Sequence, residues 1–285
     1  MNFEKIQLSD REFIERVLNS DSIYWEFSFS CIYVWNYDRT YVAKNDKYAL
    51  IYFDLGNKYL FLPPYLVDET YLKEAVNVAY NHSYKNNVEF VMRGLTFEQT
   101  KLLDGFIAKS NQNDSDYIYS VNELAELKGK KFHSKRNFVN RFTSKNNYSF
   151  RQYEKNDYEK AVALCEKWLN NKESNATLEF TAIKKSLELC DVLHLKIGVL
   201  FIRETLVGLS ISDITPNGVA HTLFEKGDID YEGVYQAINY LTAKELLVGC
   251  NLVNRQEDMG IEGLRKAKLS YNPIKLAEKY YITKC

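Results

Sequence analysis

Short apolar runs and one helical repeat of apolar residues mark the first half of this chain. The strand-like runs 48–54 and 58–62 predict two strands around a Gly56-Asn57 turn. Leu72, Ala75, Val76 and Ala79 recur with the spacing of an amphipathic helix. A short strand at 88–92 and a helix opened by Thr96, carrying Leu102, Leu103 and Phe106, complete the pattern. The sequence therefore predicts a small α/β unit over residues 1–115, ended by the apolar-free stretch 109–116.

The second half follows a longer order of elements. Asn217-Gly218 is a strong hairpin signal and separates two of three consecutive predicted strands. The predicted elements are strand 148–153, helices 157–171 and 176–190, strands 195–202, 206–214 and 219–225, helix 231–248, strand 251–256, helix 261–269, and a last strand in which Ile274, Leu276, Tyr280 and Ile282 alternate with Lys275, Lys279 and Thr283.

The second half resembles a GNAT acyltransferase domain in the order of its elements. This order is three antiparallel strands, a crossover helix, a parallel strand, a helix and an edge strand. We therefore expect a mixed α+β and α/β fold built as a duplicated GNAT-like unit, with mixed central sheets flanked by helices. Residues 1–115 would form the N-terminal GNAT-like domain and residues 116–285 the C-terminal one.

Composition excludes several classes of protein. The 285 residues carry 37 basic and 38 acidic side chains, a net charge of −1, which excludes a uniformly basic nucleic-acid coat. No run approaches the length of a membrane span, and the N-terminus lacks the features of a secretory signal. Five dispersed cysteines and four histidines show no metal-ligand spacing, so we expect reduced thiols, no metal and no cofactor. These features predict a cytoplasmic protein, with peripheral membrane association as the alternative.

The segment 254–273 is the richest polar stretch, where a predicted parallel strand ends and a short helix begins. Ligands of open α/β sheets favour the carboxyl ends of such strands. Glu257 and Asp258 are the candidate catalytic base, since an attacking amine or hydroxyl must lose its proton and burial could raise a carboxyl pKa. The candidate substrate-binding residues are Asn254, Arg265, Lys268, Tyr271, Lys275 and Lys279. Arg265 and Lys268 would share a helix face and hold a phosphate or carboxylate, and Lys275 and Lys279 would extend that positive surface from the outer face of the last strand.

A second candidate region is the basic stretch 128–145, which has seven cationic residues and no acidic one. Phe132, Val139 and Phe142 would form the buried side of a helix there. Lys130, Lys131, Lys135 and Arg136 are the candidate RNA- or phosphate-binding residues, and a merely solvated helix face is the alternative.

Two further features refine these expectations. Asp228, Asp230 and Glu232 precede the predicted crossover helix, where acetyl-CoA-dependent GNAT enzymes carry a basic, Gly-rich turn, so the carboxylates disfavour CoA unless they only cap the helix. His221 could serve as a base, although an inert sheet histidine is the more common case.

In the segment 254–280 and in the basic stretch, the chain resembles a bacterial family related to the C-terminal catalytic domain of phosphatidylglycerol lysyltransferase. The matching positions are Asn254, Glu257-Asp258, Gly260, Gly263-Leu264-Arg265, Lys268, Tyr271, Pro273 and Lys279-Tyr280, together with the stretch 128–137. The resemblance implies a tandem GNAT fold similar to the Fem-type peptidyltransferases. It also implies transfer of an aminoacyl group from charged tRNA to a lipid headgroup.

We therefore expect an enzyme that moves an activated, tRNA-linked aminoacyl group to an amine or hydroxyl acceptor such as a lipid headgroup. The alternatives are an acyl-CoA-dependent N-acyltransferase and a non-catalytic binding protein for an anionic polymer.

Overall fold

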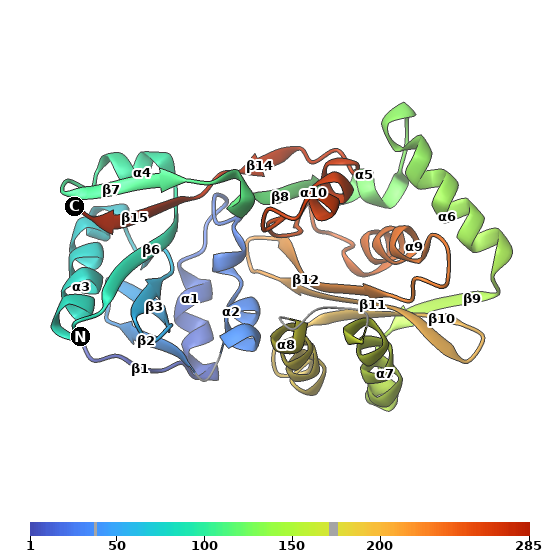
Figure 1. The fold of residues 1–285 in the computed structure, drawn as a ribbon, viewed down its shortest axis with the longest axis horizontal. Coiled ribbons are helices and arrows are strands. Elements are labelled where there is room, and N and C mark those ends of the chain that lie inside the picture. The colour runs from blue at the N-terminus through green and yellow to red at the C-terminus, as the bar shows by residue number, and fades with distance from the viewer. Residues whose placement is uncertain (37–38, 171–175) are drawn as a thin grey trace. The chain divides into compact units, whose positions relative to one another are not determined.

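The computed structural model describes residues 1–36, 39–170 and 176–285, which form two compact units (Figure 1). The first unit comprises residues 1–116, 257–261 and 276–285, and the second comprises residues 117–256 and 262–275. The chain therefore returns to its first unit at the C-terminal end, which differs from the expectation that residues 116–285 form one domain. The predicted helix 157–171 ends on a residue outside the described ranges.

The first unit is built on a mixed sheet with the strand order β1-β2-β3-β4-β6-β15-β7, and β5 pairs with β3. The strand predictions at 48–54 and 58–62 are confirmed, whereas residues 106–110 form an edge strand and not the end of a helix. The strands are β1 (Glu4–Lys5), β2 (Thr40–Lys44), β3 (Tyr48–Asp54), β4 (Lys58–Phe61), β5 (Tyr65–Leu66), β6 (Glu89–Leu95), β7 (Phe106–Ser110) and β15 (Tyr280–Lys284), and the helices are α1 (Arg11–Arg16), α2 (Phe29–Asn36), α3 (Leu72–Lys85) and α4 (Phe97–Lys101).

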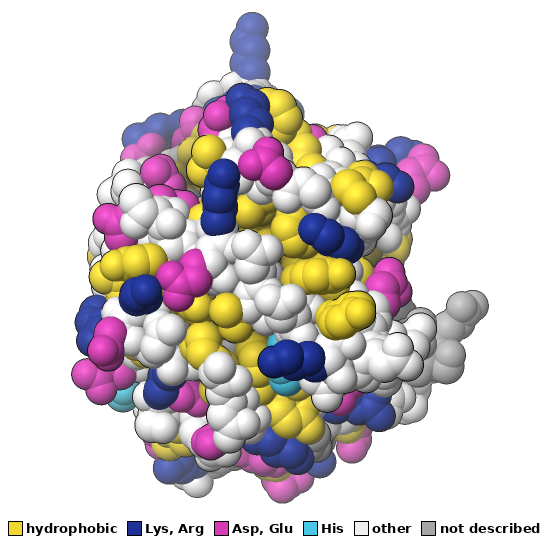
Figure 2. Space-filling model, turned by 90° about the vertical axis from the view of Figure 1, so that its left-hand side faces the viewer, with side chains coloured by type: hydrophobic (Ala, Val, Ile, Leu, Met, Phe, Trp, Pro, Cys, Tyr) yellow, Lys and Arg dark blue, Asp and Glu magenta, His cyan; other side chains and the backbone are white. Residues whose placement is uncertain are grey.

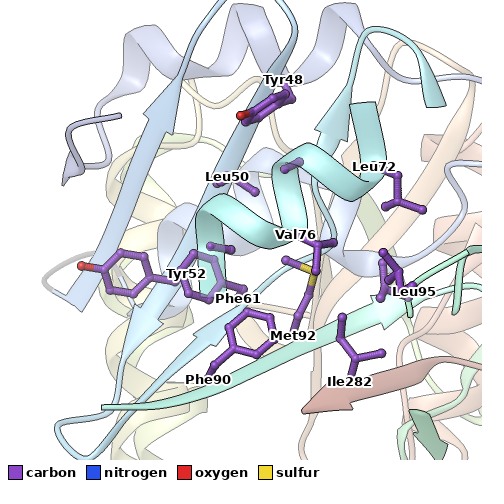
Figure 3. Packing of buried hydrophobic residues seen from close by; sticks show 13 residues of the cluster. Tyr48, Leu50, Tyr52, Phe61, Leu72, Val76, Phe90, Met92, Leu95 and Ile282 are labelled. Carbon is purple, nitrogen blue, oxygen red and sulfur yellow. The ribbon is translucent and has the colours of Figure 1, made fainter. Parts of the chain in front are cut away.

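Helix α3 connects the parallel neighbours β4 and β6 and covers the sheet between them. Its apolar face packs Leu72 and Val76 against Met92 and Leu95 of β6 and Ile282 of β15 (Figure 3). All five side chains are fully buried. This core fixes the C-terminal strand β15 beside β6 in the first sheet, with the edge strand β7 beyond it.

The outer surface of the first unit has no dominant charge on the face drawn in Figure 2, where basic and acidic side chains are interspersed with hydrophobic ones. A shallow hollow of about 310 Å³ lies on this unit and is lined by Tyr80, Tyr84, Val88, Glu89, Phe90, Thr283 and Lys284. Its single lysine and single glutamate balance each other.

The second unit contains a sheet with the order β14-β8-β13-β12-β11-β10-β9. The predicted hairpin strands are confirmed, with Gly218 at a φ of +79° in the turn between the second and third. The strands are β8 (Asp116–Ser120), β9 (Tyr148–Gln152), β10 (Lys196–Ile202), β11 (Thr205–Ile214), β12 (Val219–Gly227), β13 (Leu252–Asn254) and β14 (Lys275–Ala277), and the helices are α5 (Val121–Glu126), α6 (His133–Lys145), α7 (Tyr158–Leu169), α8 (Ala176–Glu188), α9 (Val234–Leu241) and α10 (Glu262–Leu269).

Helix α9 is the crossover between β12 and its parallel neighbour β13. It lies on the opposite face of this sheet from α7 and α8 (Figure 1). Glycines at 208 and 227 let it approach closely, because a Cβ on Gly227 would lie 2.8 Å from the Val234 side chain. The helix continues as a π-helical turn over Thr242–Leu246, a distortion that is common near functional sites.

The predicted last strand is divided between the two sheets. Residues 275–277 form β14, and residues 280–284 form β15 between β6 and β7. The expectation that Lys275 and Lys279 share an outer face is wrong: Lys275 is exposed, whereas Lys279 lies in the break between the strands and is 1% exposed. Alternation predicted extended backbone here but carried no information about which sheet the chain would join.

Candidate functional site

The parallel strands β12 and β13 of the second unit diverge shortly after they meet. Their register pairs residues 219–221 with residues 252–254 and then stops, although β12 continues to Gly227. Such a divergence leaves room for side chains or ligands at the carboxyl end of the parallel pair. Glu225 of β12 and Arg255, the first residue after β13, occupy this place.

Glu225 and Arg255 form an ion pair across the divergence, with side chains only 11% and 14% exposed. The other carboxylate oxygen of Glu225 accepts a hydrogen bond from the Asn239 amide of α9 at 3.2 Å. Burial alone would lower the pKa of Arg255, but the charge of Glu225 raises it above its ordinary value. The guanidinium therefore remains charged in a largely desolvated position.

Several buried polar atoms on β11, on the helix that begins as α9 and on Arg255 have no hydrogen-bond partner among the described residues. Ser210 lies opposite Glu225 in the β11–β12 register, so their side chains share the face that α9 covers. The atoms concerned are the Ser210, Ser212 and Thr242 hydroxyls, the Asn239 carbonyl oxygen and Nη1 of Arg255. Unsatisfied buried groups are rare in proteins and indicate sites that water or a ligand fills.

Two tyrosines and a lysine complete the site on its outer side. The Arg255 guanidinium lies 5.0 Å from the centre of the Tyr271 ring and 5.7 Å from that of Tyr119 in β8. The Lys135 ammonium of α6 lies 4.2 Å from the centre of the same Tyr271 ring. The structure therefore brings together Lys135 from the basic stretch and Tyr271 from the C-terminal segment, which were predicted as separate motifs.

Lys268 and Asn254 shape the loop that carries Arg255. The Lys268 ammonium donates to the carbonyl oxygens of Arg255 and Gln256, the latter at 3.0 Å. The Asn254 side chain accepts the Gln256 N–H at 2.6 Å, and the Tyr119 hydroxyl donates to the Lys268 carbonyl at 2.9 Å. Both candidate residues are buried, and these contacts hold the loop that presents Arg255.

The first unit contains a separate cluster of buried charges. Lys279 contacts Glu26 at 3.1 Å, Asp116 at 2.9 Å and Glu257 at 3.7 Å, while Arg93 contacts Glu26 at 3.0 Å and Glu257 at 3.3 Å. Three carboxylates thus face two cations. Lys279 holds this network together and does not contribute to a positive surface.

The environment of Glu257 differs from the one that a catalytic base requires. Burial alone would raise the pKa of this carboxyl, but the charges of Lys279 and Arg93 lower it to about 2. Asp258, fully buried, accepts the Gly260 N–H at 2.8 Å and its carbonyl accepts the Ile261 N–H, so it shapes a tight turn. Of the two carboxylates, only Asp258 remains our candidate for the base.

The basic stretch folds as predicted, with Phe132, Val139 and Phe142 buried. Its cations, however, are largely occupied: Lys131 pairs with Glu123 at 2.6 Å, and Arg136 donates to the Leu127 and Gly129 carbonyls. Lys128, Arg141 and Lys145 also pair with carboxylates, from Glu126 and Glu232. Lys130 is exposed. These pairs reduce the positive field that the sequence alone suggested.

The acidic loop before α9 is neutralised by neighbouring cations. Lys167 contacts Asp228 at 2.8 Å and Asp230 at 2.5 Å, and Glu232 pairs with Arg141. Helix α6 closes over the start of α9, because a Cβ on Gly233 would lie 2.9 Å from the Phe138 carbonyl oxygen. That oxygen lies where a pyrophosphate would approach the helix N-terminus, which disfavours CoA at this place.

His221 is fully buried, and burial lowers its pKa to about 3. Its neutral ring lies 3.4 Å from the Thr215 hydroxyl in the sheet. With a pKa of about 3 the ring is a weak base at neutral pH, and this environment favours the inert sheet histidine.

Arg265 is half-buried on α10, and Lys275 is exposed. Sequence reasoning missed Glu225, Asn239 and Arg255. A usable signal was present for Glu225: it is the one carboxylate of the predicted strand 219–225, and an inward-facing charge there requires a partner.

The described residues contain neither a membrane-spanning helix nor a cluster of metal ligands. Within the ranges that the structure describes, no helix is long and apolar enough to cross a membrane. The same residues contain no group of three or more histidine, cysteine, aspartate or glutamate side chains arranged to hold a metal ion.

Comparison with known proteins supplies relatives for the whole chain. An uncharacterised protein of Mycoplasmoides gallisepticum is 25% identical over 189 residues, which are 60% of this chain and 57% of that protein, so the match spans little more than half of the relative. A conserved protein of unknown function from Bacteroides thetaiotaomicron has a similar crystal structure, with a TM-score of 0.91, 29% identity and full coverage of both chains.

More distant structures share the fold. L-PGS from Bacillus licheniformis superposes with a TM-score of 0.73 at 14% identity over 99% of this chain and 93% of that one. FemX gives a TM-score of 0.62 at 11% identity over 98% and 97% of the two chains, and a tandem GNAT protein of clavulanic acid biosynthesis gives 0.51 at 7% over 99% and 98%. The predicted duplicated GNAT-like fold is confirmed.

The family described as phosphatidylglycerol lysyltransferase, C-terminal, matches residues 22–283, nearly the whole chain. The resemblance inferred from the C-terminal segment and the basic stretch is thereby confirmed. The chain belongs to the family of phosphatidylglycerol lysyltransferase C-terminal domains, a family of transferases with a tandem GNAT-like fold.

Proposed function

We propose that this protein transfers an aminoacyl group from charged tRNA to an amine or hydroxyl acceptor such as a lipid headgroup. The observation that carries the proposal is the Glu225–Arg255 pair, which places a desolvated cation where two parallel strands diverge. Membership of a lysyltransferase family supports the same type of reaction.

The charged and polar groups of this site would act on different atoms of the reacting molecules. The acceptor nitrogen or oxygen attacks the ester carbonyl carbon, and the bond from that carbon to the tRNA ribose oxygen breaks. Arg255 would stabilise the negative charge that develops on the carbonyl oxygen, since a preorganised donor in a desolvated site is worth most there. Glu225 and the Asn239 carbonyl oxygen would accept hydrogen bonds from the ammonium of the aminoacyl group.

The proton released by the acceptor must reach the ribose oxygen that leaves. Of the two predicted candidates for the base, Glu257 has a pKa near 2 and is a weak base, so the candidate that mutagenesis should test is Asp258. Lys268, Asn254 and Tyr119 would act as positioning residues through the loop that presents Arg255.

Transfer of a labelled amino acid from charged tRNA to an extracted lipid fraction tests the proposal. We expect labelled lipid with the unmodified protein and a loss of about 100-fold in rate for Arg255→Met. Lys196→Met, which removes an exposed lysine outside the candidate site, is the matched control and should retain full activity. Absence of transfer from every charged tRNA by folded protein would refute the assignment. A separate loss of transfer in Asp258→Asn, with unchanged folding, would identify the base.

A further inference from the structure

Lys135 differs from the other cations of the basic stretch. Its neighbours Lys131 and Arg136 engage a carboxylate and two backbone carbonyls. Lys135 is half-buried against the ring of Tyr271, and the described part of the chain provides neither an ion pair nor a hydrogen bond to its ammonium. A half-buried ammonium without an anion loses hydration and gains little in return.

Arg255 likewise has a guanidinium nitrogen without a hydrogen-bond acceptor among the described residues. Its Nη2 contacts Glu225, whereas Nη1 is buried without an acceptor among the described residues. An unsatisfied buried donor is costly in free energy, and more so when it is charged. The free protein therefore retains a charged donor that an additional acceptor would stabilise.

Both cations lie against the ring of Tyr271. Their distances to the centre of the ring are 4.2 Å for Lys135 and 5.0 Å for Arg255, and among the described residues Glu225 is the single carboxylate paired with either. Burial and the nearby charge of Arg255 both lower the pKa of Lys135, which is the expected effect of two like charges brought together. The local excess of positive charge favours an anion.

We infer that Lys135 and Arg255 form a binding site for the phosphate group of a phosphate ester. A phosphate offers several negatively charged oxygens and can accept from a guanidinium and an ammonium together. The inference deepens the proposed function and rests on it for its biological role, because charged tRNA and phospholipid acceptors both carry phosphate esters. The site differs from the predicted pair Arg265 and Lys268, since Lys268 is buried and donates to backbone carbonyls.

Calorimetric titration of the full chain tests this inference without requiring transfer. The probes are inorganic phosphate, glycerol phosphate as the headgroup fragment and adenosine monophosphate as the fragment of the tRNA terminus. We expect saturable binding that Lys135→Gln weakens at least about tenfold, a loss typical of one charge-assisted contact. Lys196→Gln, which removes an exposed lysine of the same unit outside both candidate regions, is the matched control and should bind like the unmodified protein.

The possible outcomes test the phosphate site and the proposed reaction independently of each other. Stronger binding of glycerol phosphate would show that the bound phosphate ester belongs to the acceptor headgroup. Stronger binding of adenosine monophosphate would show that it belongs to the tRNA terminus. Equal phosphate affinity of the unmodified protein and Lys135→Gln, or the absence of saturable binding, would overturn the inference even if transfer is observed. Phosphate binding that depends on Lys135 in a protein without transfer would retain the site and refute the reaction. Thermal melting of both variants serves as the control for folding.

Discussion

Glu225 and Arg255, thirty residues apart in sequence, form an ion pair beyond the last paired residues of β12 and β13. Glu225→Gln leaves the guanidinium buried without its counter-charge, so we expect a loss of about 2–4 kcal/mol in the free energy of unfolding. Urea denaturation of the single variants and of Glu225→Gln combined with Arg255→Met would measure their coupling. The double variant should cost less than the sum of the two, and strict additivity would show that the pair is not coupled.

Lys279 provides a contrast with Lys275, four residues earlier. Lys279→Met removes the cation that contacts Glu26, Asp116 and Glu257, and three carboxylates would then face Arg93 alone. We expect a loss of about 3–5 kcal/mol in unfolding free energy. Lys275→Met, at an exposed position, should change it by less than about 0.5 kcal/mol. Similar midpoints of denaturation for the two variants would contradict the observed burial.

His221 makes stability depend on pH in a defined direction. Its pKa is about 3 in the folded protein and 6.5 in a model peptide, so the unfolded chain binds the extra proton between these values. Stability should therefore fall as the pH decreases from 6.5 toward 3, by about 1.4 kcal/mol per unit for this group. Unfolding free energies measured across mildly acidic pH should show a smaller slope in His221→Asn than in the unmodified protein. Equal slopes would show that His221 does not titrate in this way.

Alanine substitutions at Gly233 and Gly249 would distinguish the cost of backbone strain from the cost of steric contact. Both have a positive φ, +88° and +89°, but only a Cβ on Gly233 would meet an atom, the Phe138 carbonyl oxygen at 2.9 Å. Alanine should cost about 1 kcal/mol at Gly249 through its backbone conformation alone. At Gly233 we expect a further loss of about 1–3 kcal/mol, because α6 must move away from α9. Equal thermal destabilisation of the two alanine variants would indicate that α6 yields without cost.

Local patterns predicted the elements of this fold well where short-range chemistry determines them. The Asn217-Gly218 turn and the flanking apolar runs predicted β11 and β12, and the spacing of apolar residues predicted α3, α6 and α9. The family resemblance was also carried by residues close together in sequence, and it is confirmed.

The site was predicted less completely because its contacts join distant parts of the chain. Lys135 and Tyr271 are 136 residues apart, and no periodicity relates them. Lys279 was assigned to the surface because alternation cannot show that β14 and β15 belong to different sheets. Arg255 lay within the segment that was singled out, but only its partner Glu225 shows why it matters.

The place of β15 between β6 and β7 has a consequence for the order of synthesis. The backbone groups of both strands lack these partners until residues 280–284 are synthesised. Most of the second unit is translated before the first can close. Between the synthesis of residue 116 and that of residue 280, a nascent chain therefore carries an open sheet edge, which makes this interval the stage at which aggregation or chaperone capture should concentrate.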